Sequence, residues 1–157
     1  MLAIAVMLSS CSSMFHPAPS TLPPDSRLHR AVVDNDVEKV AKLVNSPFCN
    51  INKKSRGRTA LAYAVSGNNY EIAKLLLVNG AAPDIPTSVT GLSPIHDAAL
   101  KGNLDIVKLL VEHGSNPQLK GAAPNVEWTP ISAAESNSHH DVVEYLQNII
   151  NNKKCSD

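Results

Sequence analysis

The sequence predicts an all-α fold made of short helices arranged in pairs. Residues 91–114 read as two short helices joined by a tight turn, and the same pattern occurs at three other places in the chain. Aromatic residues make up only 4% of the 157 residues, so the core is expected to consist of Ala, Leu, Ile and Val. Small side chains of this kind allow helices to approach one another closely.

The clearest helix pair begins at Ser93, a favourable N-cap residue, and Pro94 follows at the first helical position, where its missing N–H costs nothing. The first helix has a narrow apolar face. After a break at Gly102, the second helix has a wider one. Gly114 is expected to end the second helix, because a left-handed residue costs least in glycine. Two helices this short cannot bury their apolar faces alone and need neighbours of the same shape.

The helix pair recurs at a nearly constant interval. Three capping residues, Thr59, Ser93 and Thr129, lie 34 and then 36 positions apart. In all four copies an acidic residue follows the first apolar residue by ten positions, as Asp105 follows Ile95. A fixed offset of this kind indicates one structural unit repeated four times.

Residues 93–99, SPIHDAA, resemble the ankyrin-repeat signature TPLHxAA, which a glycine turn and a Leu-rich helix follow. The resemblance covers residues 26–151. It implies an all-α ankyrin-repeat solenoid of four helix-turn-helix repeats joined by hairpin-like fingers. It also implies that the fingers and the concave helix surface hold a partner.

The four repeats are placed at about 26–52, 53–86, 87–120 and 121–151. The outer two depart from the pattern. The first has Lys39 and Lys42 where the third has apolar residues, and the fourth has Glu135 where alanine is usual. Terminal repeats have no outer neighbour, so these polar residues are expected to cap the stack.

A short apolar run, residues 2–10, ends in small residues just before Cys11. It is far shorter than the roughly 20 residues needed to span a bilayer, and it fits the core of a secretory signal over residues 1–10. Residues 8–11, LSSC, look like the bacterial lipobox, in which the cysteine is lipidated, so lipidation is expected at Cys11. No Lys or Arg precedes the run. Either Met1 is an internal start, or the run belongs to a disordered tail with a chance cysteine.

Residues 11–25 are rich in Pro and Ser and are expected to form a semi-extended linker behind the lipidated cysteine. Such a tether lets an anchored domain clear the membrane surface. By resemblance to lipoproteins of Gram-negative bacteria, Ser12 favours the outer membrane, since aspartate at this position after the cysteine is the usual retention signal. The expected location is therefore the bacterial periplasm, with membrane contact through the lipid only. Residues 152–157 are expected to form a polar, frayed tail.

The composition gives catalysis and nucleic-acid binding no support. The 14 basic and 14 acidic residues balance, which leaves no electrostatic footprint for nucleic acid. We find no phosphate loop, nucleophile elbow or Cys-x-x-Cys pair, and assign no catalytic residue, metal ligand or cofactor. His96, at the histidine position of the signature, is expected to bond the backbone of the neighbouring turn. The cluster at 139–141, HHD, lacks a second ligand pair at i,i+4 spacing and is not expected to hold a metal.

The predicted binding surface consists of positions that vary between the copies while the frame stays fixed. The basic run at 53–58, KKSRGR, is either a solvated turn or a patch for an acidic partner or an anionic headgroup. Trp128 either packs beneath the third finger or forms the hot spot of an interface. The candidate binding residues are Arg56, Arg58, Tyr63, Ser66, Leu92, Asp97, Leu100, Lys101, Trp128, Ser136 and Asn137.

The expected function is non-catalytic binding of another protein by a chain that is monomeric when unbound. One hypothesis is an anchored inhibitor, such as an immunity protein against a toxic periplasmic enzyme. A second is a scaffold or protective factor for an envelope or stress-response enzyme, and the third is an enzyme. A fold alone does not name a partner.

Overall fold

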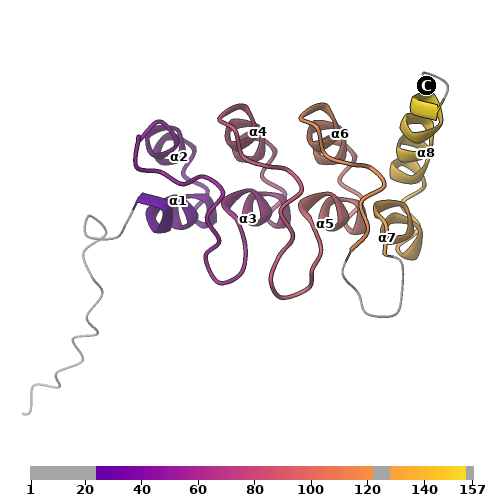
Figure 1. Cartoon of the computed structure of the whole chain (residues 1–157), viewed down its shortest axis with the longest axis horizontal. Coiled ribbons are helices and arrows are strands. Elements are labelled where there is room, and N and C mark those ends of the chain that lie inside the picture. The colour runs from indigo at the N-terminus through magenta and orange to yellow at the C-terminus, as the bar shows by residue number, and fades with distance from the viewer. Residues whose placement is uncertain (1–23, 122–127, 155–157) are drawn as a thin grey trace, which may run out of the picture.

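The computed structural model describes residues 24–121 and 128–154, and this part of the chain folds into four pairs of helices set side by side in a row (Figure 1). Within it there are eight helices and no extended strand. None of these helices is long and apolar enough to cross a bilayer. The pairs are α1 (Pro24–Val33) with α2 (Val37–Val44), α3 (Ala60–Ser66) with α4 (Tyr70–Val78), α5 (Pro94–Leu100) with α6 (Leu104–Glu112), and α7 (Pro130–Ser136) with α8 (His140–Lys154).

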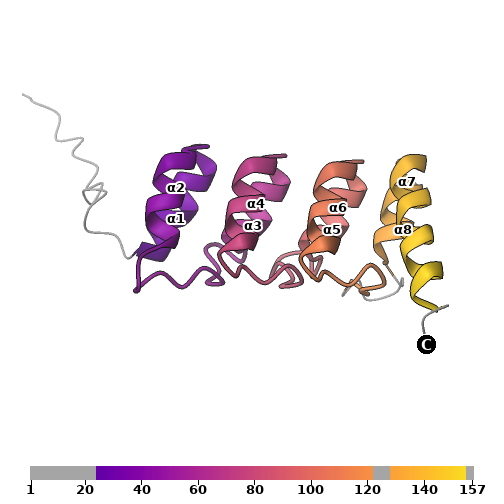
Figure 2. The ribbon, with the colours of Figure 1, turned by 90° about the horizontal axis from the view of Figure 1, so that it is seen from above.

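The row has two layers, which Figures 1 and 2 show from two directions. Helices α1, α3, α5 and α7 form one layer, and α2, α4, α6 and α8 form the other. The connections between pairs, residues 45–58, 79–92 and 113–128, are called the first, second and third fingers. The first two extend past the first layer (Figure 1), and the third is described at residues 113–121 and 128. The expected ankyrin-repeat solenoid is therefore confirmed, with α1, α3, α5 and α7 beside the fingers.

The helix starts follow the capping chemistry of the sequence. The hydroxyl oxygens of Thr59 and Thr129 each accept a hydrogen bond of 3.2 Å from the backbone N–H three residues on. Pro94 and Pro130 occupy the first helical positions, as expected. These caps fix where each short helix begins and how the preceding finger enters it.

The turn between the two helices of a pair requires a left-handed residue. In the third repeat this is Gly102, with φ 70°, and the corresponding residues elsewhere are Asn35, Asn68 and Ser138. A side chain at Gly102 would also collide with the ring of His139 in the next repeat. Space therefore favours glycine at this position, whereas asparagine and serine adopt the left-handed conformation in the other repeats.

The core is one continuous cluster of aliphatic side chains that runs through all four pairs. Leu28, Leu61 and Ile95 occupy the same position of α1, α3 and α5, and each is at most 1% exposed. Ala64 and Ala98 are fully buried where neighbouring short helices approach. The helices of one layer pack directly on one another, as α3 packs on α5.

Two boundaries differ from the prediction. Helix α1 begins at Pro24, two residues inside the expected linker, because proline is favourable in a first helical turn. Helix α8 continues to Lys154, so residues 152–154 are helical rather than a frayed tail, because no glycine ends this helix. With ten residues, α1 is longer than its partner α2, which has eight, whereas α3, α5 and α7 are shorter than the helices with which they pair. Cys11 and most of the linker lie outside the described residues.

Enlarging Ala98 should destabilise the stack. We expect Ala98→Leu to lower the free energy of unfolding by about 1–3 kcal/mol, because the site is fully buried between short helices. Urea denaturation followed by circular dichroism measures the change. Val78→Leu, at an exposed position of α4, is the matched control. Equal stability of wild type and Ala98→Leu would contradict this view of the helix contact.

Candidate functional site

Hydrogen bonds join each finger to the next. The backbone N–H of Ser88 in the second finger donates to the carbonyl of Gly57 in the first, at 2.8 Å. The ammonium of Lys54 lies 3.4 Å from the hydroxyl of Ser88. Farther along, the Asp84 carboxylate accepts bonds from the Ser115 hydroxyl at 2.5 Å and from the backbone of Asn116 at 3.0 Å. A surface made from several fingers is therefore held in one arrangement.

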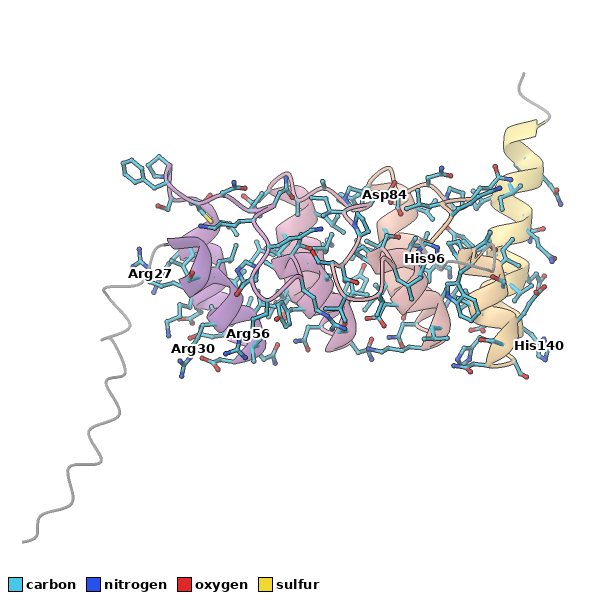
Figure 3. The ribbon with its side chains drawn as sticks, turned by 60° about the horizontal axis from the view of Figure 1, so that its bottom comes forward. Arg27, Arg30, Arg56, Asp84, His96 and His140 are labelled. Carbon is cyan, nitrogen blue, oxygen red and sulfur yellow. The ribbon has the colours of Figure 1, made fainter. Side chains whose placement is uncertain are left out.

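Two buried histidines tie a short helix to the finger that follows. The Nε2 of His29 donates to the carbonyl of Arg58 at 3.2 Å, and that of His96 donates to the carbonyl of Trp128 at 3.0 Å. Because a carbonyl only accepts, Nε2 of His96 carries the proton and Nδ1 accepts from the Ser93 hydroxyl at 2.8 Å. Figure 3, seen from the finger side, labels His96 in this position. Its expected structural role is confirmed.

Burial lowers the pKa of His96 below its ordinary value of 6.5, although the carbonyl bond to Trp128 opposes the shift. The side chain is fully buried, so the charged form would lose its hydration. The imidazole is therefore neutral in the folded protein near pH 7, as its hydrogen bonds also require.

Four of the predicted binding residues form a polar chain across α3 and α5. Arg58 donates to the hydroxyl of Ser66 at 3.1 Å, and that hydroxyl donates to the carboxylate of Asp97. The ammonium of Lys101 lies 3.6 Å from the same carboxylate and 2.6 Å from the Ser66 carbonyl. Tyr63 lies beneath the chain, with the Arg58 guanidinium 6.0 Å from its ring centroid. These side chains, which vary between the repeats, therefore pair their charges and hydrogen-bonding groups with one another. Together they form a polar edge along α3 and α5.

Beside this polar chain is a hollow of about 140 Å³ between α3, α5 and the second finger, which we call the α3–α5 hollow. Its floor includes Ala62, which is 4% exposed, and its apolar wall includes Leu92 and Leu100. Five predicted residues line it. The lining residues are Arg58, Ala62, Ser66, Thr87, Thr90, Leu92, Ser93, Pro94, Asp97 and Leu100.

The remaining predicted residues lie outside the hollow. Arg56 is exposed on the first finger, with φ 50° (Figure 3). Ser136 donates to the carbonyl of Ala133 at 2.8 Å, and Asn137 donates to the carbonyl of Leu100 at 2.7 Å. The amide of Asn137 therefore links the third and fourth repeats.

Trp128 is half-buried and packs against the core, as the structural interpretation of this residue expects. Its indole Nε1 is buried, and we find no acceptor for it among the described residues. The backbone of Trp128 pairs with Gly121, on which the side chain of Leu92 also packs closely. The side chain of Trp128 therefore faces the core, and its part in binding stays a prediction.

Sequence reasoning did not assign the other five lining residues to the site: Ala62, Thr87, Thr90 and the capping pair Ser93 and Pro94. One signal was available in the alignment of the copies. Ala62 stands at the position that His29 and His96 occupy in the first and third repeats. The threonines carried no signal, because their location depends on how the second finger folds back.

The described residues contain no group of three or more His, Cys, Asp or Glu side chains arranged to hold a metal ion. In the HHD cluster, the ring of His139 bonds the carbonyl of Leu100 at 3.1 Å. A larger depression of about 360 Å³ lies on the opposite layer, between α4 and α6. Charged residues such as Asp105 and Glu112 surround it, and it shows no apolar centre of the kind that the hollow has.

Comparison with known proteins supports the repeat assignment. Residues 28–121 match the family described as ankyrin repeats (three copies). The chain is 32% identical over 123 residues to human cyclin-dependent kinase 4 inhibitor B, covering 78% of this chain and 86% of the inhibitor. It is 34% identical over 94 residues to cyclin-dependent kinase inhibitor 2A of Monodelphis domestica, covering 60% of this chain and 53% of that protein.

A third relative is an ankyrin repeat protein of Acanthamoeba polyphaga mimivirus, 35% identical over 122 residues. The match covers 77% of this chain but only 15% of the viral protein. The repeats are thus a protein-interaction module, shared with proteins of very different length.

The pH dependence of stability should reveal the buried His96. Because its pKa is lower in the folded chain than the unfolded value near 6.5, its contribution is complete above that pH and is lost as the pH falls below it. We expect His96→Gln to lower the free energy of unfolding by about 1–3 kcal/mol at pH 7.5. The difference in unfolding free energy between wild type and variant should become smaller below pH 6.5. Urea denaturation from pH 5 to 8 measures it. His140→Gln, at an exposed site of α8, should leave the wild-type curve unchanged. A gap that is constant with pH would contradict the assignment.

Proposed function

The chain belongs to the ankyrin-repeat family, and from that premise we propose that it binds another protein, without catalysis, across its fingers and short helices. The observation that carries this proposal is the α3–α5 hollow. It has Leu92 and Leu100 at its centre, and a polar margin in which Arg58, Ser66 and Asp97 hold one another. An apolar centre with a polar rim is the usual anatomy of a binding patch.

The bound partner is an enzyme that the chain inhibits. Supporting this, two relatives are named as inhibitors of cyclin-dependent kinases, and one of them is covered over 86% of its length. Inhibition requires only that a rigid surface occupy the partner, and the bonded fingers supply such a surface. An immunity protein against a toxic periplasmic enzyme is the specific form we favour. A partner that keeps full activity when bound would instead indicate a scaffold or protective factor.

The site of action is the periplasmic face of a bacterial outer membrane, with Cys11 carrying the lipid. This part of the proposal rests on the sequence LSSC at residues 8–11 and on Ser12. The Pro-rich segment between Cys11 and the start of α1 at Pro24 then serves as the tether. A domain held near the membrane meets its partner at a raised local concentration, which compensates for modest affinity.

The function is tested by capture and assay. Immobilised residues 24–157 are exposed to envelope extract of the source cells, and the captured protein is identified and assayed with and without the chain. Inhibition of a captured enzyme supports the proposal. Recovery of no protein above the level of a denatured control column would contradict it.

Truncating Leu100 should weaken binding of the captured partner about tenfold or more, since apolar side chains at the centre of a patch dominate affinity. Titration calorimetry measures the change, and thermal denaturation checks the fold. Lys74→Ala, exposed on α4 in the other layer, is the control. Lys108 is less suitable, because its ammonium lies 5.8 Å from the ring centroid of Tyr145. If wild type and Leu100→Ala bind the partner with equal affinity, the interface does not include Leu100.

The anchor is tested separately. We expect cells fed a fatty-acid analogue to label the wild-type chain and not Cys11→Ser, and the variant to pass into the soluble fraction, because the thiol is the acylated group. Gel fluorescence after fractionation measures both effects. Ser12→Ala, beside the cysteine, should still be labelled. Equal labelling of wild type and Cys11→Ser would exclude the lipoprotein assignment.

A further inference from the structure

One position of the repeat differs in a way that shapes the surface. In the first and third repeats a histidine fills the space between the short helix and the next finger, and bonds the carbonyl that precedes the next N-cap. In the second repeat the residue is Ala62, and the corresponding carbonyl belongs to Leu92. A methyl group neither fills the volume of an imidazole nor donates a hydrogen bond.

The three carbonyls share one backbone contact, although the fingers differ in length. The carbonyls of Arg58, Leu92 and Trp128 each accept a bond from a backbone N–H within their own finger, at 2.8, 2.9 and 2.7 Å. The histidine bond is added to this in the first and third cases. At Leu92 the carbonyl accepts the backbone bond, but the side chain of Ala62 cannot donate the second bond that a histidine supplies in the other two repeats. Both residues line the α3–α5 hollow.

We propose that the α3–α5 hollow receives one bulky apolar side chain of the partner, seated where the other repeats hold an imidazole. This inference rests on the protein-binding function proposed above. A volume of about 140 Å³ is close to the ~150 Å³ of an engineered cavity that holds benzene. The walls offered by Ala62, Leu92, Pro94 and Leu100 are apolar, so a single aliphatic or aromatic side chain fits their chemistry.

Charge selects what flanks that side chain. The first finger carries four cations and no acid between residues 53 and 58, and Lys54 and Arg56 are exposed. The one carboxylate that lines the hollow, Asp97, already contacts Ser66 and Lys101. The occupant is therefore an acidic segment of a protein, with carboxylates directed at the first finger and the apolar residue in the hollow.

Filling the hollow from within provides the test. In Ala62→His the new imidazole has the surroundings that His29 and His96 have, so the fold should be kept. The probe is a capped pentapeptide with a central leucine flanked by aspartates, titrated to about 10 mM while amide shifts of the chain are recorded. Peptides with a central alanine, or with lysines in place of the aspartates, are the matched controls.

We expect wild type to show shifts centred on Ala62, Leu92 and Leu100, at least about tenfold weaker binding of either control peptide, and no binding to Ala62→His. If Ala62→His does not fold, Thr90→Trp blocks the hollow from its exposed rim and should have the same effect. Absence of shifts with the leucine peptide, shifts elsewhere, or equal binding by the blocked variants would each overturn the proposal.

The two proposals fail differently. If Ala62→His still binds a captured partner with wild-type affinity, the chain is a binding protein that does not use the hollow. If the peptide binds but the chain captures no partner, the hollow recognises acidic-apolar segments and the proposed function is wrong. Binding to vesicles of anionic lipid in place of the peptide would assign the basic finger to a headgroup and overturn the choice of occupant.

Discussion

Burial between neighbouring repeats is the constraint on which this structure depends. Helices α3, α5 and α7 have seven residues each, whereas isolated helices below about 12 residues are marginal in water. Their stability therefore comes from contacts with the repeats on either side, through side chains such as Leu61, Ala98 and Ile95 that have essentially no exposure. Only the two end repeats have an outer face that no neighbouring repeat covers, and for this reason Lys39 and Lys42 can be exposed on α2.

The buried histidines extend the same constraint from the helices to the fingers. A short helix that bonds the carbonyl before the next cap fixes both the finger and the start of the following helix, as His96 does with Trp128. The second repeat forgoes this bond at Ala62. The backbone N–H groups of Ser88 and Ala82 donate to the Gly57 carbonyl and the Asn52 side-chain oxygen, and these two bonds hold the second finger in its place. The α3–α5 hollow therefore lies where one side-chain bond is missing and neighbouring bonds compensate.

Much of the fold could be predicted because its rules are local. Caps, left-handed turn residues and the ten-residue offset lie within a few residues of one another, so the helix pairs and their order follow from the sequence. The end of α8 was less predictable, since it depends on the absence of a stop signal. The site was predicted in part. Arg58, Ser66 and Asp97 were chosen because they vary between copies, and stacking the repeats brings them into hydrogen-bond contact.

What sequence reasoning could not supply was the direction of each side chain at a variable position. Asn137 and Trp128 vary between copies as Leu100 does, yet the amide of Asn137 bonds the carbonyl of Leu100 and the indole of Trp128 packs inward. Whether a variable residue faces a partner or the next repeat depends on spacing across the stack. That spacing between repeats is set only when the repeats are stacked in the folded chain.

The balanced composition conceals a strong polarity along the stack. Residues 26–58 hold eight Lys and Arg against three acidic residues, whereas residues 128–154 hold three acidic residues against two Lys. Figure 3 shows Arg27, Arg30 and Arg56 at one end of the row and His140 at the other. Exposed charges farther apart than about 8 Å are screened at physiological salt, so the two ends do not cancel for a partner that spans several repeats. The acidic partner proposed above would be oriented by this polarity before contact, with its acidic segment over the first finger and the hollow beside it.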